Sequence, residues 1–508
     1  MVARCCSVAF EGIEAREVDV QCHLSPGVPA FQIVGLPDKA VGESRERVRA
    51  ALGAAGLGLP SKRITVNLAP AGMPKEGSHF DLPIAVALLA EMEVIPREEA
   101  ARTLALGELG LDGAVAPVNG VLNAALAAAA SGRALVCPAA KGAEAALVDA
   151  AEIAAPDSLV ALINHMTGRH PLPRPRPAEA EPDLPVKDFA DVKGQEKARR
   201  AAEIAAAGGH NLLLMGPPGV GKSMIARRIP GILPPLEPRE ALELSMVRAL
   251  VGEIPEGRLA RQRPFEDPHH SASPAAIIGG GRGAGPGRIS LAHQGVLFLD
   301  ETVEFSRQVL ESLRQPLETG TAVVSRANAH VRYPCKVLMV AAMNPCRCGY
   351  LAEPGRACGR APKCGEDYQA RLSGPLLDRI DLQVETPTIQ ASELARLPQG
   401  EATAAIRARV IAARRRQAAR WARLGQPIAL NAEAEGDALE RGAAMEPAAQ
   451  ELLGRVADRL DLSPRGLTRV TRLALTLADL EGTESVMRRH VAEAASYRRA
   501  PLRPRLAA

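Results

Sequence analysis

A glycine-rich loop that ends in lysine and serine is the strongest chemical signal in this sequence. The loop follows an apolar stretch, Leu212–Met215, and matches the pattern G-x-x-x-x-G-K-[ST]. Glycines let backbone N–H groups point inward around a phosphate, and the start of a following helix adds positive potential. We therefore predict a nucleotide site in which Lys222 contacts the β- and γ-phosphates and Ser223 holds Mg²⁺. The loop consists of Gly216, Pro217, Pro218, Gly219, Val220, Gly221, Lys222 and Ser223.

Two further apolar stretches end in polar residues that suit the same chemistry. Residues 295–299 lead to Asp300 and Glu301, and residues 337–343 lead to Asn344. Because ligands bind at the carboxyl ends of parallel strands, we predict that Asp300 completes the Mg²⁺ shell and that Glu301 is the general base. Asn344 would bind the γ-phosphate or orient the attacking water. The alternatives are an acid pair that caps the next helix and an ordinary turn asparagine before proline.

Four cysteines in a short segment form a second group with possible chemistry. Four thiolates within 19 positions suit tetrahedral Zn²⁺. Their spacing is wider than that of the usual paired cysteine knuckles, so a loop of reduced thiols is the alternative. The cysteines are Cys346, Cys348, Cys358 and Cys364.

The elements that must position these groups belong to an α/β protein of several domains. A proline-rich linker is expected at 168–187, because proline lacks an amide donor and has a fixed φ. We predict an α+β domain over 1–167, a P-loop core with a parallel sheet over 188–390, and a helical lid over 391–508. Within the core we expect helices at 224–229 and 303–313.

Composition limits the function. The 508 residues carry a formal net charge of +4, and the basic excess lies towards the C-terminal part. Seven Phe, four Tyr and one Trp argue against an aromatic surface on which single-stranded nucleic acid stacks. The sequence has no apolar stretch of membrane-spanning length and no secretion-signal pattern, so we expect no membrane contact and a cytoplasmic location.

The motifs in combination resemble the ComM/YifB family of Mg-chelatase-like AAA+ ATPases over essentially the whole chain. The segments that carry the resemblance, besides the phosphate loop, are 191–196, 267–273, 279–281, 287–293 and 372–381. The resemblance implies that Val192, Gly194 and Gln195 lie against the adenine. It also implies that Arg379 is an arginine finger acting on a neighbouring subunit in a ring, usually a hexamer; Arg371 is the second candidate.

The same resemblance also assigns a sensor 2 arginine in the lid and a protease-like fold to the first domain. Arg465 would reach the nucleotide from the lid, with Arg469 as a substitute. Residues 1–167 resemble a Lon-protease-like domain of the ribosomal S5 domain 2-like type. Such a protease needs a serine nucleophile and a lysine base, but the sequence has His79 and Leu122 at these positions, and Ser78 is one place off. We predict no peptidase activity.

Two inserts and one helix are candidates for contact with a polymer. In the family's clade, an insert, here 269–288, and a hairpin, here 322–333, line the pore of the ring, and arginines there would contact DNA phosphates without reading sequence. The alternative for both is subunit packing. A basic, acid-free helix is either a solvated face or a DNA-facing stripe; its arginines are Arg407, Arg409, Arg414, Arg415, Arg416, Arg420 and Arg423. The candidate DNA contacts are Arg282, Arg288, Arg326 and Arg332.

The prediction is therefore an ATP-hydrolysing, Mg²⁺-dependent ring motor on DNA, a helicase or branch-migration factor in recombination or natural transformation. It would recognise DNA structure rather than sequence. One alternative is a chelatase-type ATPase that drives Mg²⁺ insertion with partner subunits. The other is a component of an ATP-dependent protease.

Overall fold

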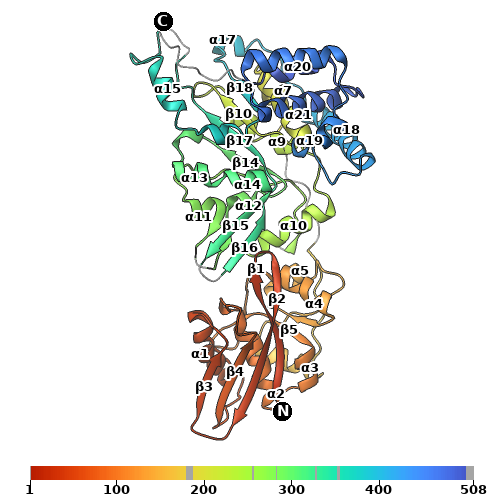
Figure 1. Cartoon of the computed structure of the whole chain (residues 1–508). Helices are drawn as coiled ribbons and strands as arrows, with labels where there is room; N and C mark the ends of the chain where they lie inside the picture. The colour runs from red at the N-terminus through yellow and green to blue at the C-terminus, as the bar shows by residue number, and fades with distance from the viewer. Residues whose placement is uncertain are drawn as a thin grey trace.

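The computed structural model describes residues 2–178, 187–254, 257–281, 283–326, 329–351 and 355–498. The chain forms three parts that follow one another along the molecule, from the N-terminal domain through the ATPase core to the helical lid (Figure 1). Part of the predicted linker, residues 179–186, lies outside the described residues, as does Arg282.

The N-terminal domain is built on a mixed sheet of seven strands in the order β3-β4-β2-β1-β5-β8-β9. Alternate residues of β4, among them Ile64, Val66 and Leu68, face a buried core, as expected for a sheet with one covered face. The strands are β1 Ala3–Glu11, β2 Glu14–Ser25, β3 Ala30–Val34, β4 Arg63–Ala69, β5 Thr103–Ala105, β8 Ala134–Val136 and β9 Glu152–Ala154. The longer helices are α1 Lys39–Ala54, α2 Asp81–Glu91, α4 Val121–Ser131 and α6 Leu159–Met166.

The ATPase core contains a parallel sheet of five strands in the order β11-β14-β17-β10-β18. Its three central strands are wholly buried, which explains their unbroken apolar sequence. The strands are β11 Phe265–Glu266, β14 Val296–Leu299, β17 Leu338–Met343, β10 Leu212–Met215 and β18 Leu382–Glu385. A separate antiparallel hairpin consists of β15 Thr321–Arg326 and β16 Ala329–Pro334.

The lid is helical, with α18 Thr403–Arg423, α20 Pro447–Leu460, α21 Pro464–Glu481 and α22 Arg488–Ala495. The basic helix α18 packs against α7 (Glu196–Gly208) and α21, so several of its arginines are structural. Arg409 binds Glu203, Arg414 donates to the Ala206 carbonyl, and Arg420 pairs with Asp479. Because these three arginines bind groups of the same chain, α18 does not form a continuous stripe of arginines free to face DNA.

The predicted fold class is confirmed, but two expected helices differ. The helix expected at 224–229 is split into α8 Lys222–Ala226 and α9 Ile229–Ile232, because Pro230 lacks an amide donor and begins a new turn. The helix expected at 303–313 begins as α13 only at Arg307, where the Ser306 side chain accepts from the Val309 N–H. Since Ser306 caps this helix, Asp300 and Glu301 do not cap it, and they are available for the predicted Mg²⁺ and general-base roles.

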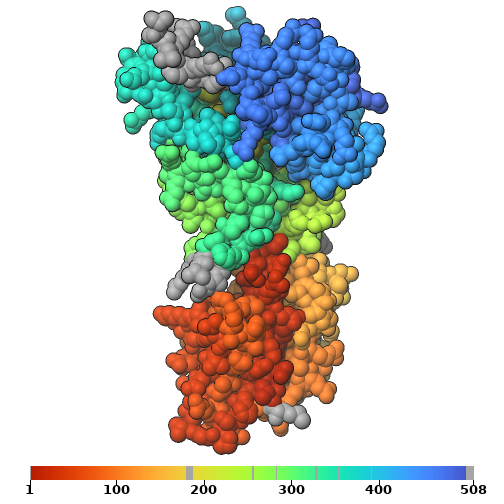
Figure 2. Space-filling view, in the orientation of Figure 1, coloured from red at the N-terminus to blue at the C-terminus, as the bar shows by residue number. Residues whose placement is uncertain are grey.

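The N-terminal domain docks on the ATPase core beside the β15–β16 hairpin (Figures 1 and 2). The turn between β1 and β2 touches β16 so closely that a Cβ on Gly12 would lie 2.4 Å from the Arg332 carbonyl oxygen. The Gly120 N–H donates to the Ala249 carbonyl at 2.9 Å, and Asn119 donates to the Leu250 carbonyl. The first domain thus contacts the hairpin that the sequence singles out as a polymer contact.

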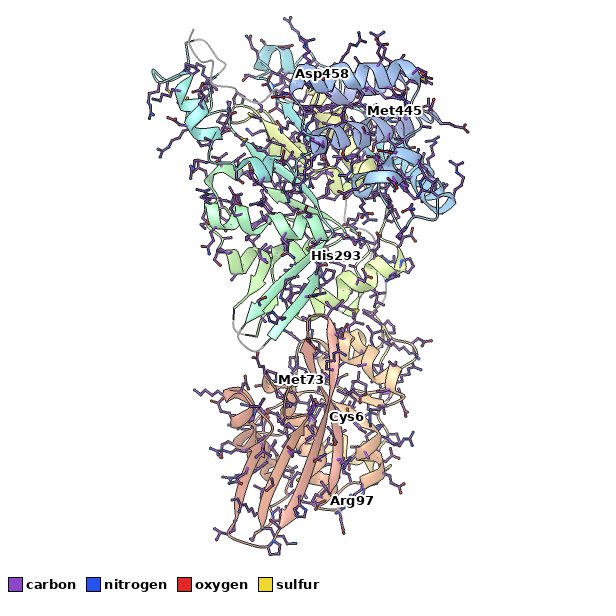
Figure 3. All side chains as sticks on the ribbon, in the orientation of Figure 1. Cys6, Met73, Arg97, His293, Met445 and Asp458 are labelled. Carbon is purple, nitrogen blue, oxygen red and sulfur yellow. The ribbon has the colours of Figure 1, made fainter. Side chains whose placement is uncertain are left out.

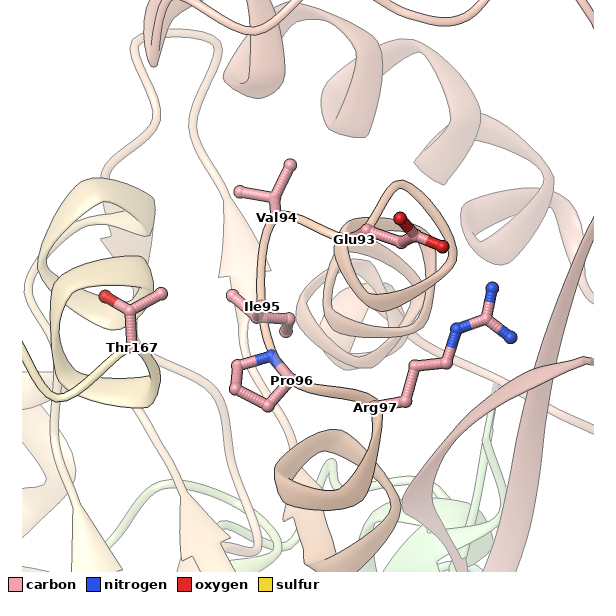
Figure 4. A pocket seen from close by; sticks show the side chains of 6 residues that line it. All are labelled: Glu93, Val94, Ile95, Pro96, Arg97 and Thr167. Carbon is pink, nitrogen blue, oxygen red and sulfur yellow. The ribbon is translucent and has the colours of Figure 1, made fainter.

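Among the described residues, no helix is both long and apolar enough to cross a bilayer. A shallow pocket of about 440 Å³ lies in the N-terminal domain between Thr167 and the connection from α2 to the short helix α3, Arg97–Arg102 (Figure 4). The side chains of Glu93 and Arg97 point away from Thr167 in this view. The pocket is far from the phosphate loop, and its lining contains no group that the predicted chemistry uses. Figure 3 marks Arg97 together with Cys6, one of the buried thiols of the same domain.

Candidate active site

Two neighbouring strands of the core, β10 and β17, bring the phosphate loop and Asn344 together. The loop follows β10, Asn344 follows β17, and the last residues of these strands, Met215 and Met343, are in register. The Lys222 ammonium donates to the Asn344 Oδ1 at 3.1 Å and to the carbonyl oxygens of Gly216 and Pro217 at 2.7 and 2.8 Å. These contacts fold the lysine back over the loop, where an incoming phosphate would take their place.

Burial lowers the pKa of Lys222, while the charges of Asp300 and Glu301 oppose that shift. A buried lysine gains from a polyanion, because the phosphate charge replaces the missing hydration. Gly219 and Gly221 have φ of +79° and +95°, which allows their N–H groups to face inward.

The Mg²⁺ residues also meet. The Ser223 hydroxyl donates to the Asp300 Oδ2 at 2.8 Å, and Asp300 follows β14, the strand beside β17. A hydroxyl and a carboxylate oxygen are ligands that Mg²⁺ prefers. The two residues therefore fit the metal by the chemistry of their donor atoms.

Glu301 lies next to this pair in a strained backbone conformation, with φ of +48°. Its carboxylate is 3.7 Å from the His270 Nδ1, and it is more than half exposed. Asp267 is three residues before His270 and lies near Asp300. Burial is the main cause that raises the pKa of Asp267, and the charge of Asp300 raises it further. Asp267 and His270 belong to the segment 267–273, which carries part of the family resemblance. Their nearness to Glu301 depends on β11 pairing with β14, which no local pattern reveals.

The predicted adenine residues lie beside the phosphate loop. The Gln195 amide donates to the carbonyl oxygens of Val220 and Pro387, which ties this segment to the loop. The Gln195 Oε1 is buried and has no hydrogen-bond partner within the described residues. A buried acceptor without a donor is costly, and an adenine amino group is a donor of suitable chemistry. Val192 is buried, and Gly194 packs against Ile389.

Arg379 lies at the end of the sheet opposite the phosphate loop. Arg379 precedes β18, and its backbone oxygen accepts from the Asn211 side chain, which precedes β10. At about 3.3 Å per residue, Asn211 and Gly216 are roughly 16 Å apart. That distance exceeds the reach of an arginine side chain, so Arg379 does not meet the phosphate loop of its own chain. Arg371 instead pairs with Glu304 at 3.4 Å.

The side chains of Arg465 and Arg469 also do not reach the phosphate loop of their own chain. Arg465 lies near Glu318, whose main partner is Arg379. Arg469 is largely buried and pairs with Asp378 and Asp381, on either side of Arg379. The structure therefore does not place Arg465 over the nucleotide of the same chain. The cause is the packing of α21, whose arginines are drawn to the acids that precede β18.

The four cysteines are brought together. The sulfur atoms of Cys346 and Cys348 are 3.1 Å apart, and those of Cys358 and Cys364 are 3.3 Å apart. Cys346, Cys348 and Cys364 have sulfur atoms within 4.8 Å of one another. A backbone N–H bond from Tyr350 and contacts with the other thiols lower the pKa of Cys348 to about 6.

The cysteine segment packs on the phosphate loop. Gly349 lies so close to Pro218 that a Cβ on the glycine would be 2.6 Å from the proline Cδ. The Gly349 N–H also donates to the Cys346 carbonyl oxygen, which closes a tight turn. The cluster is therefore mechanically connected to the nucleotide site.

The Lon-like positions of the first domain hold no serine–lysine pair among the described residues. The Ser78 hydroxyl donates to the Glu108 carboxylate, and the His79 Nε2 is 2.8 Å from the Val8 carbonyl oxygen. Lys75, which is fully buried, donates to the Pro70 carbonyl oxygen. Leu122 is a core residue.

The glycine-rich insert and the β15–β16 hairpin lie side by side. The Tyr333 hydroxyl of the hairpin donates to the Ala284 carbonyl oxygen of the glycine-rich insert. Arg332 is exposed, whereas Arg288 pairs with Glu266 at 3.1 Å. Arg282 lies outside the described residues, and the side chain of Arg326 does as well.

Comparison with known proteins agrees with this arrangement. Three family descriptions match: subunit ChlI of Mg-chelatase over residues 20–141, magnesium chelatase subunit ChlI over 188–394, and its C-terminal part over 400–498. Fold and site together define a Mg-chelatase-type AAA+ ATPase, a class that implies ATP and Mg²⁺ as ligands.

Full-length relatives narrow the class further. The chain is 42% identical to the protein YifB of Escherichia coli over 488 residues, 96% of this chain and 95% of the relative. It is 40% identical to competence protein ComM of Haemophilus influenzae, over 97% and 96% of the two chains. The 38 kDa magnesium-chelatase subunit of Rhodobacter capsulatus is 25% identical over 32% of this chain and 51% of its own length. The chain belongs to the ComM/YifB family.

Proposed function

We propose that this protein is a ring-forming motor that hydrolyses ATP and acts on DNA. The observation that carries the proposal is the convergence of Lys222, Asn344, Ser223 and Asp300 at the carboxyl ends of three adjacent strands. Lys222 would bind the β- and γ-phosphates, and Ser223 with Asp300 would hold Mg²⁺, which neutralises phosphate charge. Glu301 would accept a proton from the attacking water, and Asn344 would orient that water.

A ring is supported by the separation of Arg379 from its own phosphate loop. An arginine fork that stabilises the charge of a transferring phosphoryl group is worth about 10³–10⁵ in rate in GTPases. If Arg379 has this role, it must act on a neighbour. Mixing the Lys222→Ala and Arg379→Ala variants, each inactive alone, should restore ATPase activity, because mixed interfaces contain one intact site. Failure of every mixing ratio would contradict action between subunits.

Action on DNA is supported by the exposed Arg332 on the hairpin and by the relation to a protein named for competence. A motor gains from phosphate contacts that do not read bases, because such contacts can be made and broken at every step. We propose helicase or branch-migration activity on branched DNA, in a hexameric ring, in recombination or transformation. Separation of a labelled four-way junction, dependent on ATP and lost in Glu301→Gln, tests this. A wild-type protein that leaves every branched substrate intact would contradict it.

The chelatase alternative is less well supported. The 38 kDa magnesium-chelatase subunit of Rhodobacter capsulatus matches only 32% of this chain, although the ChlI family descriptions match most of it, and the sequence has no D-x-S-x-S metal-adhesion motif. The protease alternative requires a base for Ser78, and its described partner is the Glu108 carboxylate.

We further propose that Cys346, Cys348, Cys358 and Cys364 bind Zn²⁺. Tetrahedral Zn²⁺ with sulfur at about 2.3 Å places its ligands just under 4 Å apart. The cluster has this scale, and the low pKa of Cys348 favours the thiolate that zinc requires. Elemental analysis of protein purified under reducing conditions should give about one zinc per chain, and a content near zero would refute the site.

A further inference from the structure

Arg379 is held by a single carboxylate that lies outside the machinery described so far. Its Nη2 donates to the Glu318 Oε2 at 2.6 Å, and its Nη1 donates to the Pro375 carbonyl oxygen at 2.8 Å. The Arg379 side chain is 13% exposed, whereas that of Glu318 is 56% exposed. The guanidinium therefore lies against the protein surface with its outer face covered by Glu318.

Glu318 also interacts electrostatically with Arg465, the second arginine at this end of the sheet. Its hydrogen bond with Arg379, and more weakly the charge of Arg465, hold the pKa of the Glu318 carboxyl below its usual range. Two arginines that the family resemblance links to the nucleotide thus act on one carboxylate, Arg379 by a hydrogen bond and Arg465 by its charge. A carboxylate and a phosphate each offer a pair of oxygen acceptors to a guanidinium, so they compete for it.

The position of Glu318 in the chain gives this competition a mechanical consequence. Glu318 belongs to the last turn of α14, Arg314–Thr319, and the hairpin strand β15 begins at Thr321. The end of α14 is joined to the base of the hairpin because the Cys335 N–H donates to the Gly320 carbonyl oxygen and the Cys335 thiol contacts the Pro316 carbonyl oxygen. Only two residues separate the carboxylate from the strand.

We infer that Glu318 is a latch for Arg379. It holds the guanidinium while the neighbouring subunit presents no γ-phosphate, and its release on capture of a γ-phosphate loosens α14 at the base of the β15–β16 hairpin. The inference rests on the proposed function, since it requires Arg379 to act on a neighbour. Glu318 is a positioning residue, because it acts through Arg379 and through the hairpin.

The first test is steady-state ATPase kinetics of the full-length protein with Mg²⁺ and without DNA. An ion pair with one exposed partner is worth about two- to fivefold in an equilibrium. Glu318→Gln should therefore raise kcat by about two- to fivefold, Glu318→Asp should return it towards wild type, and Glu318→Gln should have no effect in an Arg379→Ala background. Glu451→Gln is the matched control, because Glu451 also pairs with an arginine on an exposed helix.

The outcomes separate the inference from the proposed function. If Arg379→Ala hydrolyses ATP as wild type does, the finger itself is wrong. If Arg379→Ala is inactive but Glu318→Gln equals Glu451→Gln, the finger stands and the latch is wrong. A fall in kcat in Glu318→Gln would also overturn the latch, because it would make Glu318 a support for Arg379 rather than its competitor.

The second test measures the hairpin directly by amide hydrogen exchange. ADP with beryllium fluoride, a mimic of the γ-phosphate, should raise exchange around 319–326 in the wild type relative to ADP alone. Glu318→Gln should show the raised exchange in both states. Equal exchange of the wild type with and without the mimic would overturn the connection to the hairpin.

Discussion

Replacement of Gly349 by alanine tests the connection between the cysteine segment and the phosphate loop. Gly349 has φ of +86°, and an added Cβ would lie 2.6 Å from the Pro218 Cδ. The chain supplies a matched control, because Gly355 in the same segment has φ of +87° and no atom within 4 Å of such a Cβ. Both substitutions carry the left-handed backbone cost of about 1–2 kcal/mol. Only Gly349→Ala adds the clash.

The difference between the two variants isolates the contact with Pro218. Overpacking of a close contact costs about 1–3 kcal/mol. If the phosphate loop yields, ATP affinity should fall by about 5- to 150-fold in Gly349→Ala relative to Gly355→Ala. Titration with a fluorescent ATP analogue measures this, and thermal unfolding reports the shared backbone cost. Equal ATP affinity in the two variants would refute the claim that the cysteine segment supports the loop.

Three further predictions concern other parts of the molecule. Gly12→Ala should destabilise the docking of the first domain on β16 by about 1–3 kcal/mol, whereas Gly56→Ala, with φ of +77° and open space, should show only backbone strain in the same unfolding experiment. Arg469→Met should cost about 3 kcal/mol at pH 7 in chemical denaturation, because it removes an arginine partner from the buried Asp381. Burial raises the pKa of Asp381, but His210, Arg469 and Arg472 outweigh that effect and leave it below its usual value. The stabilisation is therefore present above the unfolded-state pKa and lost as the pH falls through the folded-state pKa, so the variant and wild type should converge in acid; an equal gap at pH 7 and pH 3 would contradict this. Finally, if the cysteines bind zinc as proposed, its removal by a chelator should weaken ATP binding through the Gly349 turn, and unchanged affinity in protein that has lost its zinc would disprove that link.

The residues of the phosphate loop and its strand-end partners could be predicted from the sequence because their signals are local. The strand Leu212–Met215 was predicted with its exact limits, and Lys222, Asn344, Ser223 and Asp300 meet as the strand-end argument requires. Parallel strands must end at one edge of a sheet, so polar residues after them converge whatever the intervening chain does.

What sequence could not give depends on how separate elements pack. The nearness of His270 to Glu301 follows from the pairing of β11 with β14, and the position of Arg465 follows from the packing of α21. The arginines of α18 gave a strong charge pattern, yet several bind acids or carbonyl groups of other helices. A charge run in sequence does not reveal whether its partners are in solution, on DNA or elsewhere in the same chain.

The central claim is that ATP hydrolysis at this site drives work on DNA. The most direct measurement is the ATPase rate with and without forked or four-way DNA, for wild type and Glu301→Gln at equal protein concentration. Branched DNA should stimulate the wild type several-fold, while Glu301→Gln should still bind ATP but hydrolyse almost none with or without DNA. A wild-type rate that no DNA structure changes would rule out this coupling.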